Sequence, residues 1–347
     1  MNNEDTQPPR TARTLLLGGT LLAAALGGAI VARSFSSPQH SSAARQTRPI
    51  VQIVRQQPGL PDLADLIERL CPSVARIVPH NGEAAPNPKD GAPVPASVYS
   101  ADGWLVTSAT NLPPMPLDAL FGDGRRAALS DLRTDPVSGL AIIKADGAAP
   151  PLTYSDQAFP RVGQFAFALS TPAGTGCAAA TSMIGSDFLA DGGGVAGYVR
   201  LQPPLEGWAA GMPLIATDGR ILGIGTDDPP GALIPASIAS VVIDELMRNS
   251  LSPSTSFGFR AIDYAPPFAT RLGNVRSGAG VALVQPKSAA AKAGLEAGDI
   301  VTAVNDVPVS SASEVSRALD AISGKATLSI QRRSEQLTLS IKRAPAS

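Results

Sequence analysis

Apolar and polar residues alternate in short runs along this chain from about residue 60 onward. The first run has helical spacing. Leu63, Leu66, Ile67 and Leu70 stand at i, i+3, i+4 and i+7, which predicts a short amphipathic helix with one buried face. Pro72 follows this run, and the missing backbone N–H of proline ends a helix.

The next runs have the two-residue period of β-strands. Turn residues separate them at short intervals, and residues 80–97 form a loop rich in Pro, Gly and Asn. Many short strands with few helices predict a closed all-β barrel or a sandwich. The strand-like runs are residues 73–79, 96–109, 139–145, 164–170, 197–203 and 213–226. In the last of these, Thr217-Asp218-Gly219 marks a hairpin turn.

A second pattern begins after a predicted helix at 236–248. The stretch SLSPSTS, residues 250–256, is typical of a linker. Residues 256–343 then alternate between strands and helices: strands at 256–262 and 278–286, a short helix at 288–295, a hairpin at 299–309, a helix at 311–322, and closing strands at 326–333 and 336–343. This complete alternation predicts a separate second domain.

The N-terminal segment predicts that the chain is targeted to a membrane. Residues 14–32 are uncharged and mostly apolar, and as a helix they would extend about 28 Å, the thickness of a bilayer core. Arg10 and Arg13 precede them, so the positive-inside rule predicts a cytoplasmic tail at 1–13, a retained anchor at 14–33 and an external linker at 34–59. A cleaved signal peptide is the alternative interpretation.

The charge, cysteines and histidines of the chain argue against several classes of function. The net charge of −1 gives no electrostatic basis for nucleic-acid binding. Cys71 and Cys177 lack CxxC spacing and histidine partners, which argues against a zinc site; a disulfide and two buried thiols both remain open. His40 and His80 fall in Ser- or Pro-rich stretches, away from any catalytic pattern, and no motif indicates a metal or a cofactor.

Two sets of motifs resemble a known family. The stretch SAAAKAGLEAGDIVTAVNDVPVSS, residues 288–311, is similar to PDZ domains, with SFGF at 256–259 in the place of their carboxylate-binding loop. Upstream, ADGWLVTSA, TDPVSGLAIIK, VGQFAFALSTPAG and ALIPAS appear in the order of the HtrA (Deg) proteases. The resemblance implies a mainly β chain, with a trypsin-like double β-barrel at 60–250 and an α+β PDZ domain at 251–347, behind the N-terminal transmembrane helix.

The same resemblance locates a Ser-His-Asp triad in which every position is changed. The histidine position, after Asp102-Gly103-Trp104-Leu105-Val106-Thr107, holds Thr110. The aspartate position holds Gly139, and the serine position holds Ala210. A serine nucleophile needs an imidazole to take its proton and a carboxylate to orient that imidazole. Asp135, four residues before Gly139, is interpreted as a turn residue because Asp-Pro opens turns.

These substitutions predict a pseudoprotease that faces the periplasm from the inner membrane and binds protein or peptide C-termini. The resemblance implies that the peptide is held by Ser256, Phe257, Gly258 and Phe259 and by Val315 and Leu319 of the 311–322 helix. The resemblance is also compatible with assembly into a homotrimer. The alternative is an active serine endopeptidase of periplasmic protein quality control, with a non-standard site.

Overall fold

The computed structural model describes residues 62–80, 94–110, 112–147, 149–157, 159–172, 176–185, 199–205, 207, 209–227, 230–263 and 277–344. Residues 57–347 form one compact unit. The predicted anchor at 14–33 and the linker at 34–59 lie outside the described residues. Within the described residues, no helix has both the length and the apolar character needed to cross a bilayer.

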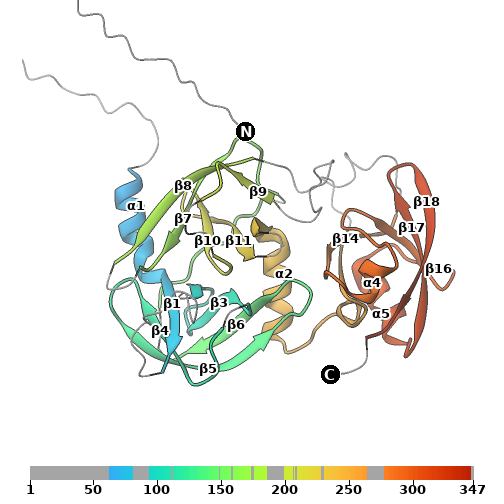
Figure 1. The fold of residues 1–347 in the computed structure, drawn as a ribbon, viewed down its shortest axis with the longest axis horizontal. Helices are drawn as coiled ribbons and strands as arrows, with labels where there is room; N and C mark the ends of the chain where they lie inside the picture. Colours follow the sequence, from blue (N-terminus) through green and yellow to red (C-terminus); the bar gives the residue numbers. More distant parts are fainter. Residues whose placement is uncertain are drawn as a thin grey trace, which may run out of the picture. The chain divides into compact units, whose positions relative to one another are not determined.

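The predicted N-terminal helix is present as α1, Leu63–Leu70 (Figure 1). Asp62 is its N-cap, and the Asp62 carboxylate accepts a hydrogen bond from the Ala64 N–H at 3.0 Å, which satisfies one of the amides left open at a helix start. A 3₁₀ turn, η1 at Cys71–Ser73, leads into the first strand with Pro72 inside it. Proline thus ends the α-helix as predicted.

The first barrel is closed by six strands in the order β1-β2-β3-β6-β5-β4. Its interior is a compact apolar cluster to which Ile77, Leu105 and Ile143 contribute fully buried side chains. The strands are β1 Val74–Pro79, β2 Val94–Val98, β3 Trp104–Ser108, β4 Leu117–Phe121, β5 Arg126–Thr134 and β6 Leu140–Ala145.

The second barrel is also closed, in the order β10-β11-β12-β9-β8-β7. Its strands are β7 Phe165–Ser170, β8 Ala178–Ile184, β9 Val199–Gln202, β10 Pro213–Ala216, β11 Ile221–Asp227 and β12 Pro230–Pro235. The predicted hairpin at 213–226 is confirmed: β10 pairs with β11, and Gly219 has a φ of 86° in the turn between them. That left-handed conformation favours glycine.

The sequence prediction was wrong about one loop and missed several strands. Part of the predicted 80–97 loop is strand β2, in which Val94 pairs with Ile77 and Ala96 pairs with Ala75. β4, β5, β8 and β12 were not predicted. β5 and β8 expose much of their length, with burial patterns that do not alternate cleanly, so their two-residue period is weak and only pairing with neighbours makes them strands.

Helix α2, Ala236–Met247, follows the second barrel and packs against β6, β11 and β12. Its buried side chains include Ile238, Val242 and Leu246. They belong to an apolar cluster that runs from the second barrel through α2 to Ala282 and Leu283 in the following sheet. α2 therefore joins three parts of the molecule through one core.

The C-terminal region is a sheet in the order β13-β14-β15-β17-β18, with β16 paired to β15. Asn305 and Asp306 have φ values of 47° and 64° between β15 and β16, which confirms the tight turn in the predicted 299–309 hairpin. Its elements are η2 Pro253–Phe257, β13 Phe259–Asp263, β14 Ala279–Val284, α4 Ala289–Lys292, β15 Ile300–Val304, β16 Val307–Pro308, α5 Ala312–Asp320, β17 Lys325–Arg332 and β18 Glu335–Lys342.

Two predicted elements of this region are shorter than expected. The 288–295 helix is reduced to α4, and Gly294 at its end has a φ of 84°, as expected for a C-terminal glycine cap. The predicted linker at 250–256 is partly a 3₁₀ helix, since Pro253 begins η2 there. Proline favours that position because its φ is already helical.

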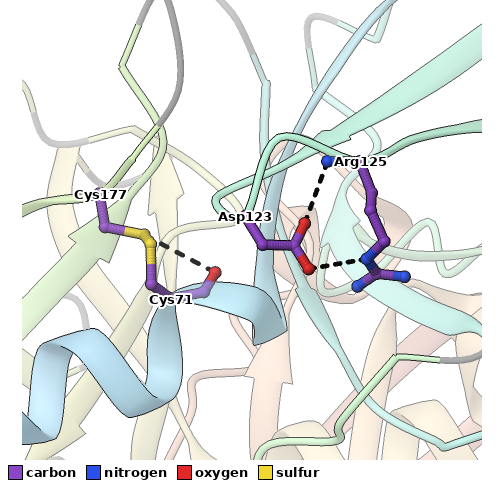
Figure 2. The surroundings of a disulfide bond; sticks show 4 residues. All are labelled: Cys71, Asp123, Arg125 and Cys177. Carbon is purple, nitrogen blue, oxygen red and sulfur yellow. Dashed lines mark hydrogen bonds and ion pairs between the residues drawn. A yellow bond between two sulfur atoms is a disulfide. The ribbon is translucent and has the colours of Figure 1, made fainter.

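Cys71 and Cys177 form a disulfide, which resolves the two alternatives left open by the sequence (Figure 2). The bond joins the end of α1 to the start of β8, across 106 residues of sequence. Gly122, after β4, packs against it: a Cβ at Gly122 would lie 2.5 Å from the Cys71 sulfur and 2.6 Å from the Cys177 sulfur. The disulfide therefore ties α1, the first barrel and the second barrel together at one point.

Candidate functional site

The three positions that the resemblance assigns to a catalytic triad lie on loops that touch one another. The Ala109 N–H, next to Thr110, donates to the Gly139 carbonyl at 2.8 Å. A Cβ at Gly211, next to Ala210, would lie 2.8 Å from the Ser108 nitrogen. The fold therefore brings the three loops together, although they are far apart in the sequence.

The side chains at these positions supply no acid–base pair. Thr110 is exposed, and its N–H donates to the Ser108 hydroxyl at 3.1 Å. Gly139 has a φ of 70° and nothing within 4 Å of the Cβ position. Ala210 is buried and has neither hydroxyl nor thiol, so the loop carries no nucleophile at that place.

The backbone donors of a serine-protease oxyanion hole are the amide of the nucleophile and the amide two residues before it, which correspond to Ala210 and Trp208 in this chain. Gly211, the residue after Ala210, has a φ of 87°, and its N–H donates to the Gly225 carbonyl at 2.9 Å. Met212, which replaces a small residue of the family motif, is buried beside it; Trp208 lies outside the described residues.

Asp135, the nearest carboxylate in sequence to the aspartate position, points elsewhere. It opens the turn before β6, as predicted, and its Oδ2 accepts from the Ser138 N–H at 2.8 Å. Its Oδ1 accepts from Arg260 Nη2 at 2.8 Å, and both side chains are fully buried. Sequence reasoning missed this pair; the available indication was a lone arginine in the otherwise apolar strand FGFRAI.

Arg260 has a second acidic partner in Glu245 of α2, at 2.7 Å from Nη1. Burial by itself lowers the pKa of Arg260, but the charges of Asp135 and Glu245 outweigh it and raise the pKa above its ordinary value. The guanidinium is therefore a permanent cation between α2, the turn before β6 and β13.

A His-Asp pair lies on the first barrel, between the end of β1 and the start of β4. His80 Nδ1 lies 2.8 Å from the Asp118 carboxylate, which also accepts from Arg126 Nε at 2.7 Å. Burial acts to raise the pKa of Asp118, and hydrogen bonds from His80 and Arg126 reverse this, so the pKa is lowered overall. Both partners of Asp118 therefore hold its carboxylate in a structural cluster on the barrel.

The predicted peptide-binding residues of the C-terminal region come together, mainly in its core. Phe257, Phe259, Val315 and Leu319 are all fully buried in one apolar cluster. Gly258 has a φ of 87°, and its N–H donates to the Thr255 carbonyl at 3.0 Å. Ser256 is half-buried, and its carbonyl accepts from the Ala344 N–H. Their role in peptide binding stays a prediction.

Next to these residues is an open cavity of about 710 Å³. It lies between α2, the segment that follows α2, the end of β13 and the start of α5. The sequence predicted a helix at 236–248 but did not indicate that this helix would form a wall of a cavity. Within the described part of the chain, no group of His, Cys, Asp and Glu could hold a metal ion.

Comparisons with known proteins agree with this architecture. A trypsin-like peptidase domain model matches residues 96–224, and a PDZ domain model matches residues 280–332. The chain is 27% identical over 268 residues to a probable periplasmic serine endoprotease, DegP-like, of Brucella suis, covering 72% of this chain. It is 24% identical over 298 residues to the periplasmic pH-dependent serine endoprotease DegQ of Escherichia coli, covering 76% of this chain and 65% of that protein.

The matched stretch spans 52% of the Brucella relative, so the chain covers about half of that protein's length. Among solved structures, a serine endoprotease from Yersinia pestis is similar, with 19% identity, a TM-score of 0.49, and coverage of 83% of this chain and 99% of that chain. A trypsin-like domain followed by a PDZ domain, together with relatives named DegP-like and DegQ, supports the assignment of this chain to the HtrA family.

Proposed function

We propose that this chain is a pseudoprotease: an HtrA-type scaffold that binds proteins or peptides and does not cut them. The observation that carries the proposal is the meeting of the three triad loops with Thr110, Gly139 and Ala210 on them. Loss of a triad lowers turnover by about 10⁶-fold, to a remainder that depends on binding and the oxyanion hole.

Binding is assigned to the PDZ region. β13 stands at the edge of its sheet, and an edge strand offers unpaired backbone groups to an extended peptide. We retain Ser256–Phe259 as the proposed carboxylate loop, with Val315 and Leu319 supporting it from α5. The proposed ligands are therefore the C-termini of proteins or peptides.

The proposed location is the periplasm. The named relatives are periplasmic proteins, and the disulfide is of a kind that persists in oxidising compartments. A single-pass inner-membrane anchor at 14–33 rests on the apolar run of the sequence alone. A homotrimer remains a proposal from the family resemblance.

Activity is tested by incubating the purified chain with unfolded casein and with a fluorophosphonate probe, beside an Ala210→Ser variant. Neither protein should cleave casein or carry the label. Thr110 and Gly139 still occupy the positions of the catalytic base and of the carboxylate that orients it, and neither residue can take that role. Inhibitor-sensitive cleavage by the unaltered chain would overturn the proposal in favour of an active endopeptidase. An Ala210→Ser variant that becomes labelled would show that a base exists elsewhere in the site.

A further inference from the structure

The cavity beside β13 is built by both halves of the molecule. α2 contributes Ser237 and Val241, its C-cap residue is Arg248, and the segment after it contributes residues 250–252. The opposite wall consists of Ala261–Asp263 at the end of β13 and the first residues of α5. A peptide that pairs with β13 would therefore contact α2 as well as the PDZ region.

The unpaired edge of β13 is suited to a peptide in an extended conformation. β13 is hydrogen-bonded to β14 along one side, and no described strand pairs with its other side. If the chain end lies at Ser256–Phe259, where β13 begins, the preceding residues of the peptide run toward Asp263, where β13 ends. The cavity then receives side chains about three to four residues before the C-terminus, from the spacing of an extended strand.

Part of the cavity wall is apolar and open to solvent. Val241 of α2 is 40% exposed and Leu251 is 39% exposed. Ile262 of β13 and Phe159, both half-buried, lie on the same cavity. Exposed aliphatic side chains that face one another across a groove bury apolar area when a ligand enters.

Three charged side chains line the cavity: the carboxylates of Glu245 and Asp263 and the guanidinium of Arg248. Glu245 is paired with Arg260 and also accepts from the Ser252 N–H at 3.1 Å. Asp263 accepts from the Ala312 N–H at 2.8 Å. The exposed Arg248 has no ion-pair partner in the part of the chain that the structure describes. Because a guanidinium binds carboxylates in a bidentate manner, its complement is an acidic side chain.

The wall formed by α2 is held in place. The buried Arg260 joins Glu245 of α2 to β13, and the core of α2 is continuous with Ala282 and Leu283 of β14. A wall anchored by a buried ion pair and a shared core needs little reorganisation when a ligand binds, which favours affinity.

We propose that helix α2 of the protease-like region forms part of the peptide site, and that Arg248 selects ligands with an acidic side chain three to four residues before their C-terminus. Val241 and Leu251 hold a neighbouring apolar side chain of the same peptide. This inference rests on the proposed peptide-binding function and adds a specificity that the PDZ region by itself does not contain.

Calorimetric titration of the whole chain with two eight-residue peptides tests it. One ends in Glu-Val-Thr-Val and the other in Gln-Val-Thr-Val, each with a free C-terminal carboxylate and also in amidated form. The Glu peptide should bind about fivefold tighter than the Gln peptide, as expected for a partly exposed charge-assisted contact. Amidation should weaken both peptides equally, since it removes the terminal carboxylate and leaves the Glu side chain in place.

Single substitutions distinguish the contribution of α2 and Arg248 to binding from that of the rest of the site. In Arg248→Gln the Glu and Gln peptides should bind alike, and in the control Arg69→Gln, an exposed arginine of α1, the fivefold ratio should remain. Val241→Asp should weaken both peptides, while Val307→Asp, at a 59% exposed position outside the cavity, should not. An unchanged ratio in Arg248→Gln together with full affinity in Val241→Asp would overturn the inference and leave the peptide-binding function intact. If the unaltered chain binds none of the peptides, the proposed function itself fails.

Discussion

Arg260 of β13 and Asp135 of the turn before β6 form an ion pair in which both side chains are fully buried, with 2.8 Å between Nη2 and Oδ1. The two residues are 125 positions apart in the sequence. The pair joins the strand proposed to receive a peptide to the turn that ends at Gly139, the aspartate position of the family triad. Next to the position that the family resemblance assigns to the catalytic aspartate, this chain has a buried ion pair that connects the barrel region to the PDZ region.

The first prediction concerns the stability of this pair. Asp135→Asn should lower the free energy of unfolding by about 3 kcal/mol, because it leaves the buried Arg260 cation with Glu245 as its remaining acidic partner. Adding Arg260→Met removes that cation, and the double variant should lose less than the sum of the two single variants. Urea denaturation of the four proteins gives the coupling energy.

The control for this prediction is Asp131→Asn. Asp131 pairs with Arg133 but is 48% exposed, so its loss should cost less than about 1 kcal/mol. Equal effects of Asp135→Asn and Asp131→Asn would show that the buried pair contributes no more than a surface one.

The second prediction concerns the contact between Gly122 and the disulfide. Gly122→Ala places a methyl group 2.5 Å from the Cys71 sulfur and 2.6 Å from the Cys177 sulfur, so the strand and the disulfide must separate. We expect a loss of about 1–3 kcal/mol, as for other overpacked sites. Thermal unfolding measures the loss, and titration of free thiols in the oxidised protein shows whether the bond still forms.

A matched substitution is Gly324→Ala, since nothing lies within 4 Å of the Cβ position there. It should leave the melting temperature almost unchanged. If both variants melt at the same temperature, the packing of Gly122 against the disulfide is not a source of stability.

The third prediction is a pH dependence that comes from Asp118. Its pKa is lowered in the folded protein from the ordinary 3.8, so its ion cluster stabilises the fold above that pH. The contribution is lost as the pH falls below 3.8 through the folded pKa, because the unfolded chain then binds more protons. Asp118→Asn should therefore be less stable than the unaltered chain at pH 7, by about 1–3 kcal/mol.

The difference between the two proteins should shrink as the pH is lowered from 5 toward 2. Chemical denaturation at a series of pH values measures it. A difference that stays constant across this range would mean that the variant acts through packing and not through the charge of Asp118.

The sequence by itself determined much of this protein. The spacing of Leu63 to Leu70 and the turn at Thr217-Asp218-Gly219 are local patterns, and both elements are present. The proposal that Thr110, Gly139 and Ala210 stand at the triad positions likewise comes from the sequence, because a hydroxyl, imidazole or carboxylate is a matter of residue type. The order of motifs gave the double barrel and the PDZ domain.

The tertiary structure decided what depends on distant partners. Strand β2 exists because Val94 and Ala96 pair with β1, and Cys71 meets Cys177 because the fold brings the end of α1 to the start of β8. Arg260 and Asp135 each have an unremarkable local context, and only the packing of β13 against the barrel region removes both from water. Whether a charge is buried, and which surface faces a cavity, are properties of the folded chain; no local spacing contains them.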